Sequence, residues 1–402
     1  MPADNKVRVG VWRRPALVFL SALILRLAVF WLLLENNRLS WGVNEPGAIA
    51  RAMVEGKGFS SAFHDAPGPT AWLAPVYPTL LAGIFKLFGI QTRASEIVAV
   101  LLNAVFSALT AVVVFRFGKA QFDDRTGAVA GWFWALSPPL LYIPWLAWDT
   151  SLSGLLLLIA LGAILRLNAS SRLREWGECG AIWGFAALLN PALAAPLPLL
   201  ALDARRQSGH WRGVGTMICV CVLTVLPWTI RNYYAFGHLV PLRSNFWPEV
   251  YFGNVDFSLH PIGNSMLYQR EGEMTFASDL KGRMLNLVRE DPVAFLKRSG
   301  KGAIAFWTLP RQQWPYPIVL AILSFGGITQ AYRKNRRWIA FASVLLLYPL
   351  VYYLSYTIAR YRYPVEPLMY LLASFFVVQW FLPQASRGLR RCVPAETRGA
   401  SN

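Results

Sequence analysis

The sequence predicts an all-α polytopic membrane protein, with about ten transmembrane helices and amphipathic juxtamembrane helices in two long outer loops. Of its 402 residues, 55% are hydrophobic and 15% are charged, whereas a typical soluble domain has about 25% charged residues. This composition excludes a disordered chain. Long apolar runs exclude a nucleic-acid-binding protein despite the net charge of +18, and four cysteines provide no disulfide framework.

The first apolar run, residues 16–34, follows a basic segment that includes Arg13 and Arg14. The run is longer than the core of a signal peptide, and no small-residue cleavage site follows it. We therefore expect an uncleaved first helix with a cytoplasmic N-terminus. Arg26 lies in the middle of this helix, where a charge is costly and usually faces the bundle interior, so we expect a structural role for it.

Further apolar stretches approach the roughly 20 residues that a bilayer core requires. Asn190-Pro191 and two later prolines interrupt the fourth of these stretches, which leaves open whether it is one crossing or two short helices. Counted as two, it brings the number of crossings to ten. The stretches are 96–117, 127–142, 151–167, 182–202, 213–227, 317–331, 338–356 and 364–382.

The distribution of basic residues sets the predicted orientation. With ten crossings both termini are cytoplasmic, and the basic clusters then lie on the side that the positive-inside rule requires. The segment 72–89 is also apolar, but a crossing there would reverse every later cluster, so we expect a juxtamembrane or re-entrant helix on the outer face. A short basic tail, 383–402, ends the chain. The clusters are Arg116/Lys119/Arg125, Arg166/Arg172/Arg174, Arg205/Arg206/Arg212, Arg333/Lys334/Arg336/Arg337 and Arg387/Arg390/Arg391.

Two long segments, 35–95 and 229–315, are predicted to be outer loops of a single membrane-embedded domain that spans residues 1–402. Both are too apolar and aromatic for flexible linkers. Within the second, the polar stretch 267–301 has apolar residues at three- and four-residue spacings, which is typical of amphipathic helices on the outer membrane surface. These residues are Met284, Leu285, Leu287, Val288, Phe295 and Leu296.

Two carboxylates, Glu45 and Asp149, are predicted on the outer face among apolar and Trp-rich neighbours. Burial there would raise the pKa of a carboxyl group and make it a better base. A purely structural interpretation stays open for both. Glu45 would begin a helix that Asn44 caps, and Asp149 would cap the helix that follows it.

Four arginines, Arg231, Arg243, Arg360 and Arg362, are predicted at outer helix ends. The planar guanidinium fork suits phosphate oxygens, although interfacial arginines also bind lipid head groups without specificity. A metal site has little support, because the four histidines show no ligand spacing. One of them, His64, stands beside Asp65. We therefore expect no metal cofactor, with a divalent cation left possible but unsupported by ligand spacing.

The order of these features resembles the membrane-embedded glycosyltransferases of the C-type superfamily, in particular bacterial relatives of dolichyl-phosphate-mannose protein mannosyltransferases. An acid in the first outer loop precedes a helix and a Gly-x-Gly turn. An apolar helix that ends in Phe-Gly and a second outer acid follow. The matching stretches, which together span nearly the whole chain, are NEPGAIARAMVEGKGFS, APVYPTLLAGIFKLFG, WDTSLS, LPWTIRNYYAFGHLVPLRSN and RYRYPVEPL.

The resemblance implies an enzyme of the bacterial inner membrane that moves a sugar from a polyprenyl-phosphate donor to a hydroxyl acceptor on the periplasmic face. Glu45 maps onto the catalytic base and Asp149 onto the second acid, and the four arginines become candidates for binding the donor phosphate. The implied partners are the lipid-linked sugar, membrane lipids and an acceptor that is protein, lipid or glycan, with no nucleic acid. Candidates for the substrate groove are Trp72, Tyr77, Trp148, Glu249 and Asn254.

Two other functions stay open on the sequence. A transporter or flippase of lipid-linked sugars would use ionisable residues near the membrane midplane and broken helices, for which Arg26 and Asn190-Pro191 are the support. A catalytically inactive scaffold of the same fold is supported by Asn44, where many relatives have Asp. The sugar, the anomeric outcome and the oligomeric state are not specified by the sequence.

Overall fold

The structure, a computed structural model, describes residues 14–34, 45–63, 66–255, 257–261, 265–310, 312, 314–334 and 336–391, with only the backbone for 381–391. Within these ranges the secondary structure is helical apart from two isolated β-bridges near residues 60–69. This confirms the predicted all-α polytopic membrane architecture. Arg13, Asn44, His64, Asp65 and the tail from residue 392 onward lie outside the described residues.

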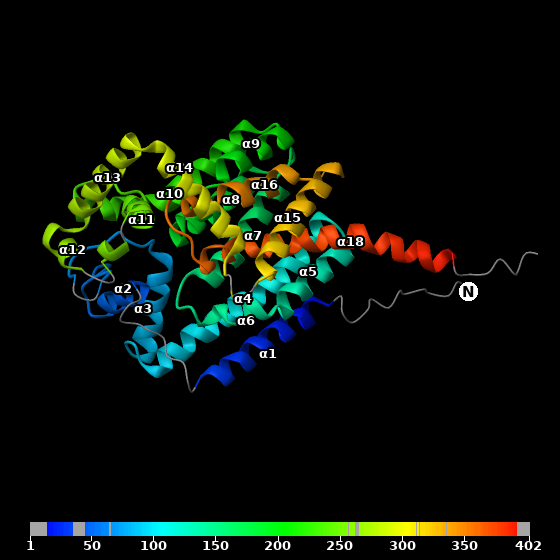
Figure 1. Ribbon diagram of the computed structural model, residues 1–402, viewed down its shortest axis with the longest axis horizontal. Helices are drawn as coiled ribbons and strands as arrows, with labels where there is room; N and C mark the ends of the chain where they lie inside the picture. Colours follow the sequence, from blue (N-terminus) through cyan, green and yellow to red (C-terminus); the bar gives the residue numbers. More distant parts are fainter. Residues whose placement is uncertain are drawn as a thin grey trace, which may run out of the picture.

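Every predicted crossing coincides with a helix or with a pair of helices (Figure 1). By length and composition, three of the described helices, α1, α4 and α10, are apolar enough to cross a bilayer, or four if the bent pair 138–145 and 150–166 forms one span. The single helices are α1 (Pro15–Leu33), α4 (Arg93–Gln121), α7 (Thr150–Arg166), α10 (Trp211–Phe236), α15 (Tyr316–Arg333) and α18 (Glu366–Arg391). The pairs are α5 (Asp124–Leu136) with α6 (Pro138–Leu141), α8 (Leu173–Leu189) with α9 (Leu197–Ser208), and α16 (Trp338–Leu347) with α17 (Leu350–Leu354).

The interrupted stretch 182–202 forms two helices that run in opposite directions. The first, α8, ends at Leu189, because Asn190 is extended and the following prolines begin a short 3-10 turn before α9. The Asn190 amide contacts Asp149 at one end of the bundle. Asp203 of α9 lies beside Arg337 at the opposite end. The chain therefore turns back at Asn190, as a count of ten crossings requires.

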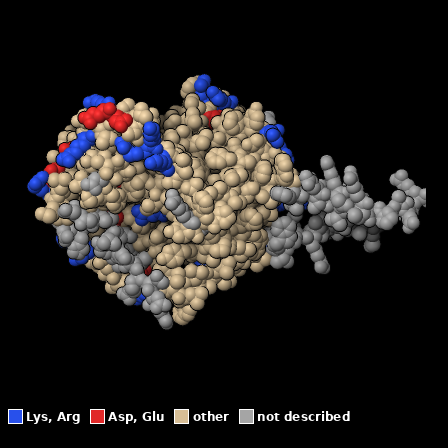
Figure 2. Space-filling model, viewed as in Figure 1, with Lys and Arg blue, Asp and Glu red and all other residues tan. Residues whose placement is uncertain are grey.

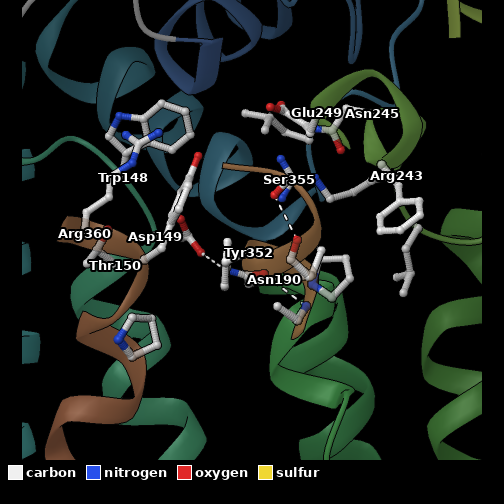
Figure 3. A pocket seen from close by; sticks show the side chains of 18 of the residues that line it. Trp148, Asp149, Thr150, Asn190, Arg243, Asn245, Glu249, Tyr352, Ser355 and Arg360 are labelled. Atoms are coloured by element: carbon white, nitrogen blue, oxygen red, sulfur yellow. Dashed lines mark hydrogen bonds between the residues drawn. The ribbon is translucent and has the colours of Figure 1, made fainter. Parts of the chain in front are cut away.

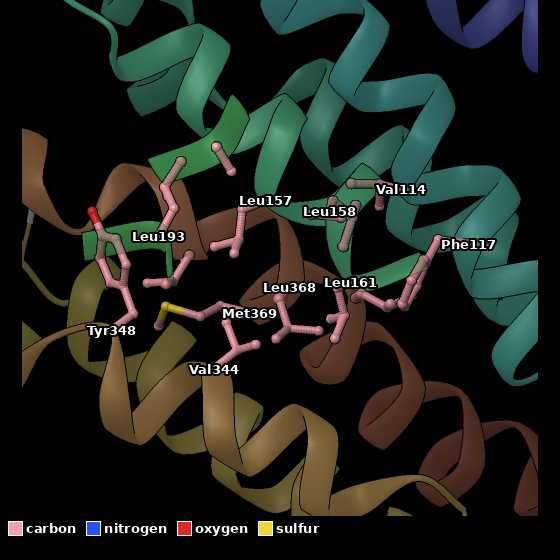
Figure 4. Packing of buried hydrophobic residues seen from close by; sticks show 14 of the residues in the cluster. Val114, Phe117, Leu157, Leu158, Leu161, Leu193, Val344, Tyr348, Leu368 and Met369 are labelled. Atoms are coloured by element: carbon pink, nitrogen blue, oxygen red, sulfur yellow. The ribbon is translucent and has the colours of Figure 1, made fainter. Parts of the chain in front are cut away.

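Small residues allow close packing of α8 against α10. A Cβ at Gly180 would lie 2.2 Å from the carbonyl oxygen of Met217, and one at Gly184 would lie 2.7 Å from Cβ of Thr224. Such contacts are typical of membrane helices, which pack through small residues. The central core is formed by leucine, valine and aromatic side chains of α4, α7, α16 and α18 (Figure 4).

The helices of the two outer segments gather at one end of the bundle, on the left of Figure 1. One face of α13 is buried against the first outer segment, where Phe276 and Trp72 lie 6.4 Å apart between ring centroids. The apolar face of α13 is therefore buried within the protein, whereas Leu296 of α14 is exposed. These helices are α2 (Glu45–Val54), α3 (Val76–Phe88), α11 (Phe246–Asn254), α12 (Met266–Glu271), α13 (Glu273–Glu290) and α14 (Pro292–Thr308).

The surface shows the polarity expected of a membrane protein. On the face shown in Figure 2, most charged side chains gather over α12–α14 and along the upper right margin. The broad surface between them is largely uncharged, as a surface that contacts lipid tails requires. Large apolar side chains of α10 are also exposed, and Val222 and Leu223 are each more than half exposed.

Arg26 is buried in the helix bundle, with 1% of its surface exposed. Its guanidinium donates hydrogen bonds to the Ser107 hydroxyl (2.8 Å) and to the carbonyl oxygens of Ala22 (2.9 Å), Ala135 (3.3 Å) and Trp134 (3.4 Å). The charge joins α1 to α4 and α5 through these dipoles. This arrangement fits the structural role expected from the sequence.

The change Arg26→Met should lower the free energy of unfolding by about 2 kcal/mol, because it leaves a hydroxyl and three carbonyl groups without their shared donor. Thermal unfolding in detergent micelles measures the effect. Arg116→Met, at an exposed position on α4, is the control and should melt as the wild type does. Equal melting of both variants would contradict a structural role for Arg26.

Candidate functional site

A cavity of about 330 Å³ lies where the outer segments meet the ends of the bundle helices (Figure 3). It contains both predicted acids, two of the four predicted arginines and two of the five groove candidates. Its walls come from the start of α2, the start of α7, the break after α8, the segment before α11 and the segment between α17 and α18. Among the lining residues are Glu45, Trp148, Asp149, Asn190, Arg243, Asn245, Glu249, Tyr348, Tyr352, Tyr356, Arg360 and Tyr361.

Glu45 is the first residue of α2 and is only 6% exposed. Its Oε2 atom is buried and accepts no hydrogen bond from any described residue. Burial raises the pKa of this carboxyl to about 7, against the opposing charges of Arg360 and Arg243, and the charge of Glu249 adds to the shift. Near neutral pH the group is therefore ready to accept a proton.

Asp149 stands directly before α7, but its side chain makes no capping hydrogen bond. Its Oδ2 atom instead accepts hydrogen bonds from the Ser153 hydroxyl (2.8 Å) and the Asn190 amide (3.1 Å). The break after α8 thus supplies a donor that holds the carboxylate in the cavity wall. The capping interpretation does not describe the side chain of Asp149.

Arg360 and Arg243 are the two predicted cations that line the cavity. The Arg360 guanidinium lies 3.7 Å above the ring of Trp148, and Figure 3 shows the two groups stacked. Stacking uses the flat face of the guanidinium and leaves its N–H edge for hydrogen bonds. Arg243 donates through Nε to the carbonyl of Trp72 at 3.0 Å, so its terminal nitrogens are the groups left for a ligand.

The other two predicted cations are not part of the cavity lining. Arg231 donates to the carbonyl oxygens of Thr70 (2.7 Å) and Phe59. Arg362 is buried and pairs with Glu366 at 2.9 Å, one turn further along the chain. Because these guanidinium groups are engaged in internal contacts, the structure does not place them where a donor phosphate would meet the two acids.

Glu249 and Trp148, two of the groove candidates, line the cavity. The Asn245 amide donates to Oε1 of Glu249 at 2.9 Å. Burial raises the pKa of Glu249, and the nearby charge of Arg243 opposes the shift. The cavity therefore contains a second carboxyl that is readily protonated.

The remaining three groove candidates make supporting contacts within the protein. Trp72 is fully buried in the outer aromatic cluster beside Phe63. Tyr77 accepts a hydrogen bond from the Asn103 amide at 3.2 Å and lines a much smaller neighbouring cavity of about 30 Å³. Asn254 donates to a backbone carbonyl at 2.7 Å. None of these three lines the cavity of about 330 Å³ that contains Glu45.

A group of tyrosines on the cavity wall was not predicted from the sequence. Tyr352 and Tyr361 stack with their ring centroids 4.5 Å apart, and the Tyr361 hydroxyl lies 3.2 Å from that of Tyr356. The four-residue spacing of Tyr348, Tyr352 and Tyr356 was the available signal, because it places the three rings on one side of a helical segment. The sequence predicts Asn190 only as the site of a helix break. A residue at a break near an outer helix end can also direct its side chain into a cavity at that end.

Glu273 is a further residue that the sequence did not single out. Its carboxylate is 6% exposed and accepts four hydrogen bonds from both outer segments. The donors are the Thr70 hydroxyl (2.5 Å), the Ala71 amide (2.7 Å), the Ser244 hydroxyl (2.7 Å) and the Tyr268 hydroxyl (2.5 Å). This junction fixes the segments that carry Leu73 and Arg243 into the cavity.

The carboxyl groups of the cavity are not grouped as a set of metal ligands. Among the described residues, no group of three His, Cys, Asp or Glu side chains is close enough together to hold a metal ion. Asp149 is already bonded to Ser153 and Asn190. We therefore assign no step to a metal.

The fold is similar to that of a solved archaeal oligosaccharyltransferase, so the resemblance indicated by the sequence holds at the level of fold. The archaeal oligosaccharyltransferase of Archaeoglobus fulgidus, solved with Zn and sulfate, aligns over 93% of this chain with 14% identity and a TM-score of 0.57. A second structure of this enzyme, AglB with an inhibitory peptide and a dolichol-phosphate, aligns over 96% with 14% identity and a TM-score of 0.56. The chain covers 50% and 52% of those two chains.

A further solved structure, ArnT from Cupriavidus metallidurans bound to undecaprenyl phosphate, aligns over 94% of this chain and 79% of its own. The identity is 15%, and the TM-score of 0.41 is too low to establish a common fold. No known family profile matches the sequence, and no curated protein matches it.

The buried acid of the cavity should reduce the stability of the folded protein at high pH. The pKa of Glu45 rises from 4.5 to about 7 on folding, so between these values the folded state binds more protons and stability falls as pH rises. At pH 8 the change Glu45→Gln should therefore increase the free energy of unfolding by up to about 3 kcal/mol. At pH 4.5 it should have little effect.

Thermal unfolding of both proteins at the two pH values tests this expectation. Glu55→Gln, in the turn directly after α2 and paired with Arg51 and Lys57 at the surface, is the control. Its carboxyl has a pKa lowered to about 2 by these partners, so its loss should not stabilise the protein at pH 8. An identical response of Glu45→Gln and Glu55→Gln would contradict a raised pKa of the buried Glu45 carboxyl.

Proposed function

We propose that this chain is a membrane glycosyltransferase, which moves a sugar from a polyprenyl-phosphate donor to a hydroxyl acceptor. The observation that carries the proposal is the buried Glu45 carboxyl, with its pKa raised to about 7, in one cavity with two arginines. An acid that accepts a proton near neutral pH and a cationic wall for a phosphate are the two groups that this reaction requires. The shared fold with an oligosaccharyltransferase supports the same class of reaction.

Glu45 acts as the general base in this proposal. It takes the proton of the acceptor hydroxyl while the acceptor oxygen forms a bond to the anomeric carbon of the sugar. The bond between that carbon and the phosphate oxygen breaks, and its electron pair leaves with the polyprenyl phosphate. The products are the glycoside, the lipid phosphate and protonated Glu45, so atoms and charge balance.

Arg360 and Arg243 stabilise the negative charge that grows on the leaving phosphate. Both lie on the cavity wall, and Arg360 is held by its stacking on Trp148. A guanidinium held in place before the reaction gives more stabilisation than a mobile one, because no reorganisation is needed as the charge develops. The stacked pair Tyr352 and Tyr361 provides an apolar wall against which a sugar ring can rest.

The arrangement of the bundle supports an outer, periplasmic active site in a bacterial inner membrane. The ends of α4, α7 and α9 and the start of α16 meet at the end opposite the cavity, and the adjoining sequences carry four of the predicted cytoplasmic clusters. By the positive-inside rule that end faces the cytoplasm. The cavity with Glu45 is then on the outer side.

The transporter alternative loses one of its two supports. Arg26 is held by four hydrogen bonds inside the bundle, so it is not a mobile charge along a substrate path. The inactive-scaffold alternative is separated from the enzyme by activity measurements alone.

The change Glu45→Gln should lower kcat by about 10²- to 10⁴-fold while polyprenyl-phosphate binding is retained, as expected for loss of a general base. In the wild type, kcat/KM should rise about tenfold per pH unit up to a pH near 7 and then level off, since only the ionised carboxylate accepts the proton. Release of polyprenyl phosphate from a panel of lipid-linked sugars, in bilayer discs with an envelope extract as acceptor, provides the rates.

The matched control is Glu55→Gln, which removes a surface carboxyl just after the end of α2 and should keep the wild-type rate. Lipid transport without release of polyprenyl phosphate would favour the transporter, and lipid binding without either would favour the scaffold. Release that is indifferent to Glu45 but is lost in Asp149→Asn would move the base to Asp149.

Arg360→Gln should lower kcat/KM for the lipid-linked donor by about 10²-fold, because one preorganised cation no longer faces the leaving phosphate. Arg360→Lys should recover only part of the rate, since an ammonium group retains the charge but lacks the planar fork. Arg231→Gln tests the expectation that Arg231 has a structural role. It should lower the melting temperature through the lost bonds to Thr70 and Phe59, and a rate loss without destabilisation would return Arg231 to the phosphate site.

A further inference from the structure

A second, larger cavity of about 520 Å³ lies at the opposite end of the bundle from Glu45. It is formed by the last turns of α4, α7 and α9 and by the first turn of α16. Leu165 at this cavity and Thr150 at the first cavity are both on α7, so the two cavities lie about 23 Å apart along the helix axis at 1.5 Å per residue. The lining residues are Ala120, Gln121, Leu165, Asp203, Gln207 and 336–339.

The central feature of this cavity is a buried carboxylate with an incomplete set of partners. Asp203 is 6% exposed, and its Oδ2 atom lies 3.7 Å from Nη1 of Arg337. This separation is too long for a hydrogen bond, and no described residue donates a hydrogen bond to Asp203. A buried charge usually has such donors, because losing water without replacing it is costly. The carboxylate and the guanidinium therefore both retain hydrogen-bonding capacity for a molecule in the cavity beside them.

The remaining lining groups define the chemistry of that molecule. Arg336 and Arg337 offer planar forks of donors, which match the oxygens of a phosphate group. The Asp203 carboxylate accepts hydrogen bonds, and the amides of Gln121 and Gln207 both donate and accept them. Hydroxyl groups of a ligand can form hydrogen bonds with this carboxylate and with these amides, whereas a bare phosphate would be repelled by Asp203.

We propose that this cavity binds a phosphate ester that carries free hydroxyl groups, of the glycerol-phosphate type. The phosphate lies against Arg336 and Arg337, and the hydroxyls donate to Asp203. Two sources provide this chemistry: the head group of phosphatidylglycerol and a soluble polyol phosphate. The position of the cavity at helix ends that carry the predicted cytoplasmic basic clusters favours the phospholipid, because such clusters attract anionic head groups. The proposal does not depend on the glycosyltransferase reaction.

Binding to the purified full-length protein in micelles of a neutral detergent tests the proposal. The probes are dioleoyl phosphatidylglycerol, dioleoyl phosphatidylethanol, dioleoyl phosphatidylcholine and soluble glycerol 3-phosphate. Phosphatidylethanol is the matched probe for the hydroxyls, since it is a phosphodiester of the same charge without them. Native mass spectrometry measures the bound lipid, and thermal unfolding measures its effect on stability.

The wild type should bind phosphatidylglycerol at least tenfold more tightly than phosphatidylcholine and several-fold more tightly than phosphatidylethanol. Arg337→Gln and Arg336→Gln should each weaken phosphatidylglycerol binding about tenfold, as loss of one charge-assisted contact implies. Arg336 is exposed, so its change tests the site even where Arg337→Gln does not fold. Arg125→Gln, an exposed position at the start of α5 outside the cavity lining, is the charge-matched control and should bind as the wild type does.

Asp203→Asn should remove the preference for phosphatidylglycerol over phosphatidylethanol while binding of both lipids is retained. Competition by glycerol 3-phosphate distinguishes the sources: displacement of the lipid identifies a soluble ester as occupant, and no displacement identifies the phospholipid. Equal phosphatidylglycerol binding by the wild type and by both arginine variants would overturn the proposal. Equal wild-type binding of phosphatidylglycerol and phosphatidylethanol would overturn the role of the hydroxyls.

Discussion

The carboxylate of Glu273 organises the outer half of this molecule. Segments without regular hydrogen-bonded structure cannot lie in hydrocarbon, because their backbone groups would lack partners, so the chain places them beyond the helix ends. There Glu273 accepts donors from residues 70 and 71 of the first outer segment and from residues 244 and 268 of the second. Four donors on one buried carboxylate compensate for its lost hydration. The two segments are thereby fixed against each other, and the cavity forms between them and the helix ends.

The two kinds of buried acid at this end of the protein differ in their partners. Glu273 has four donors, whereas Oε2 of Glu45 has none among the described residues. The four hydrogen bonds of Glu273 join the two outer segments and give that acid a structural role. Burial of Glu45 raises its pKa to about 7, which reduces stability at neutral pH but provides a usable base. Stabilising contacts elsewhere in the outer segments compensate for this cost.

The sequence predicts the crossings well, because each depends on a long apolar run and on breaks at proline, such as the one after Asn190. It also identifies the acids Glu45 and Asp149, since a carboxylate beside apolar helix ends is rare. The contacts that each side chain makes are less predictable. Trp72 and Tyr77 lie in the right segment, but their rings turn into the supporting core. The sequence predicts the helix end at which a residue lies and not the direction of its side chain, which depends on segments that are far away in the chain.

The same limit explains which outer arginines remain for a ligand. Irregular backbone presents carbonyl groups that need donors, and a guanidinium can satisfy several of them at once. Arg231 is used in this way by Phe59 and Thr70, and Arg243 uses one of its nitrogens for Trp72. Arg360 instead stacks on an aromatic ring, which occupies its face and not its edge. Of the cations near Glu45, Arg360 and Arg243 therefore both retain donors for a phosphate.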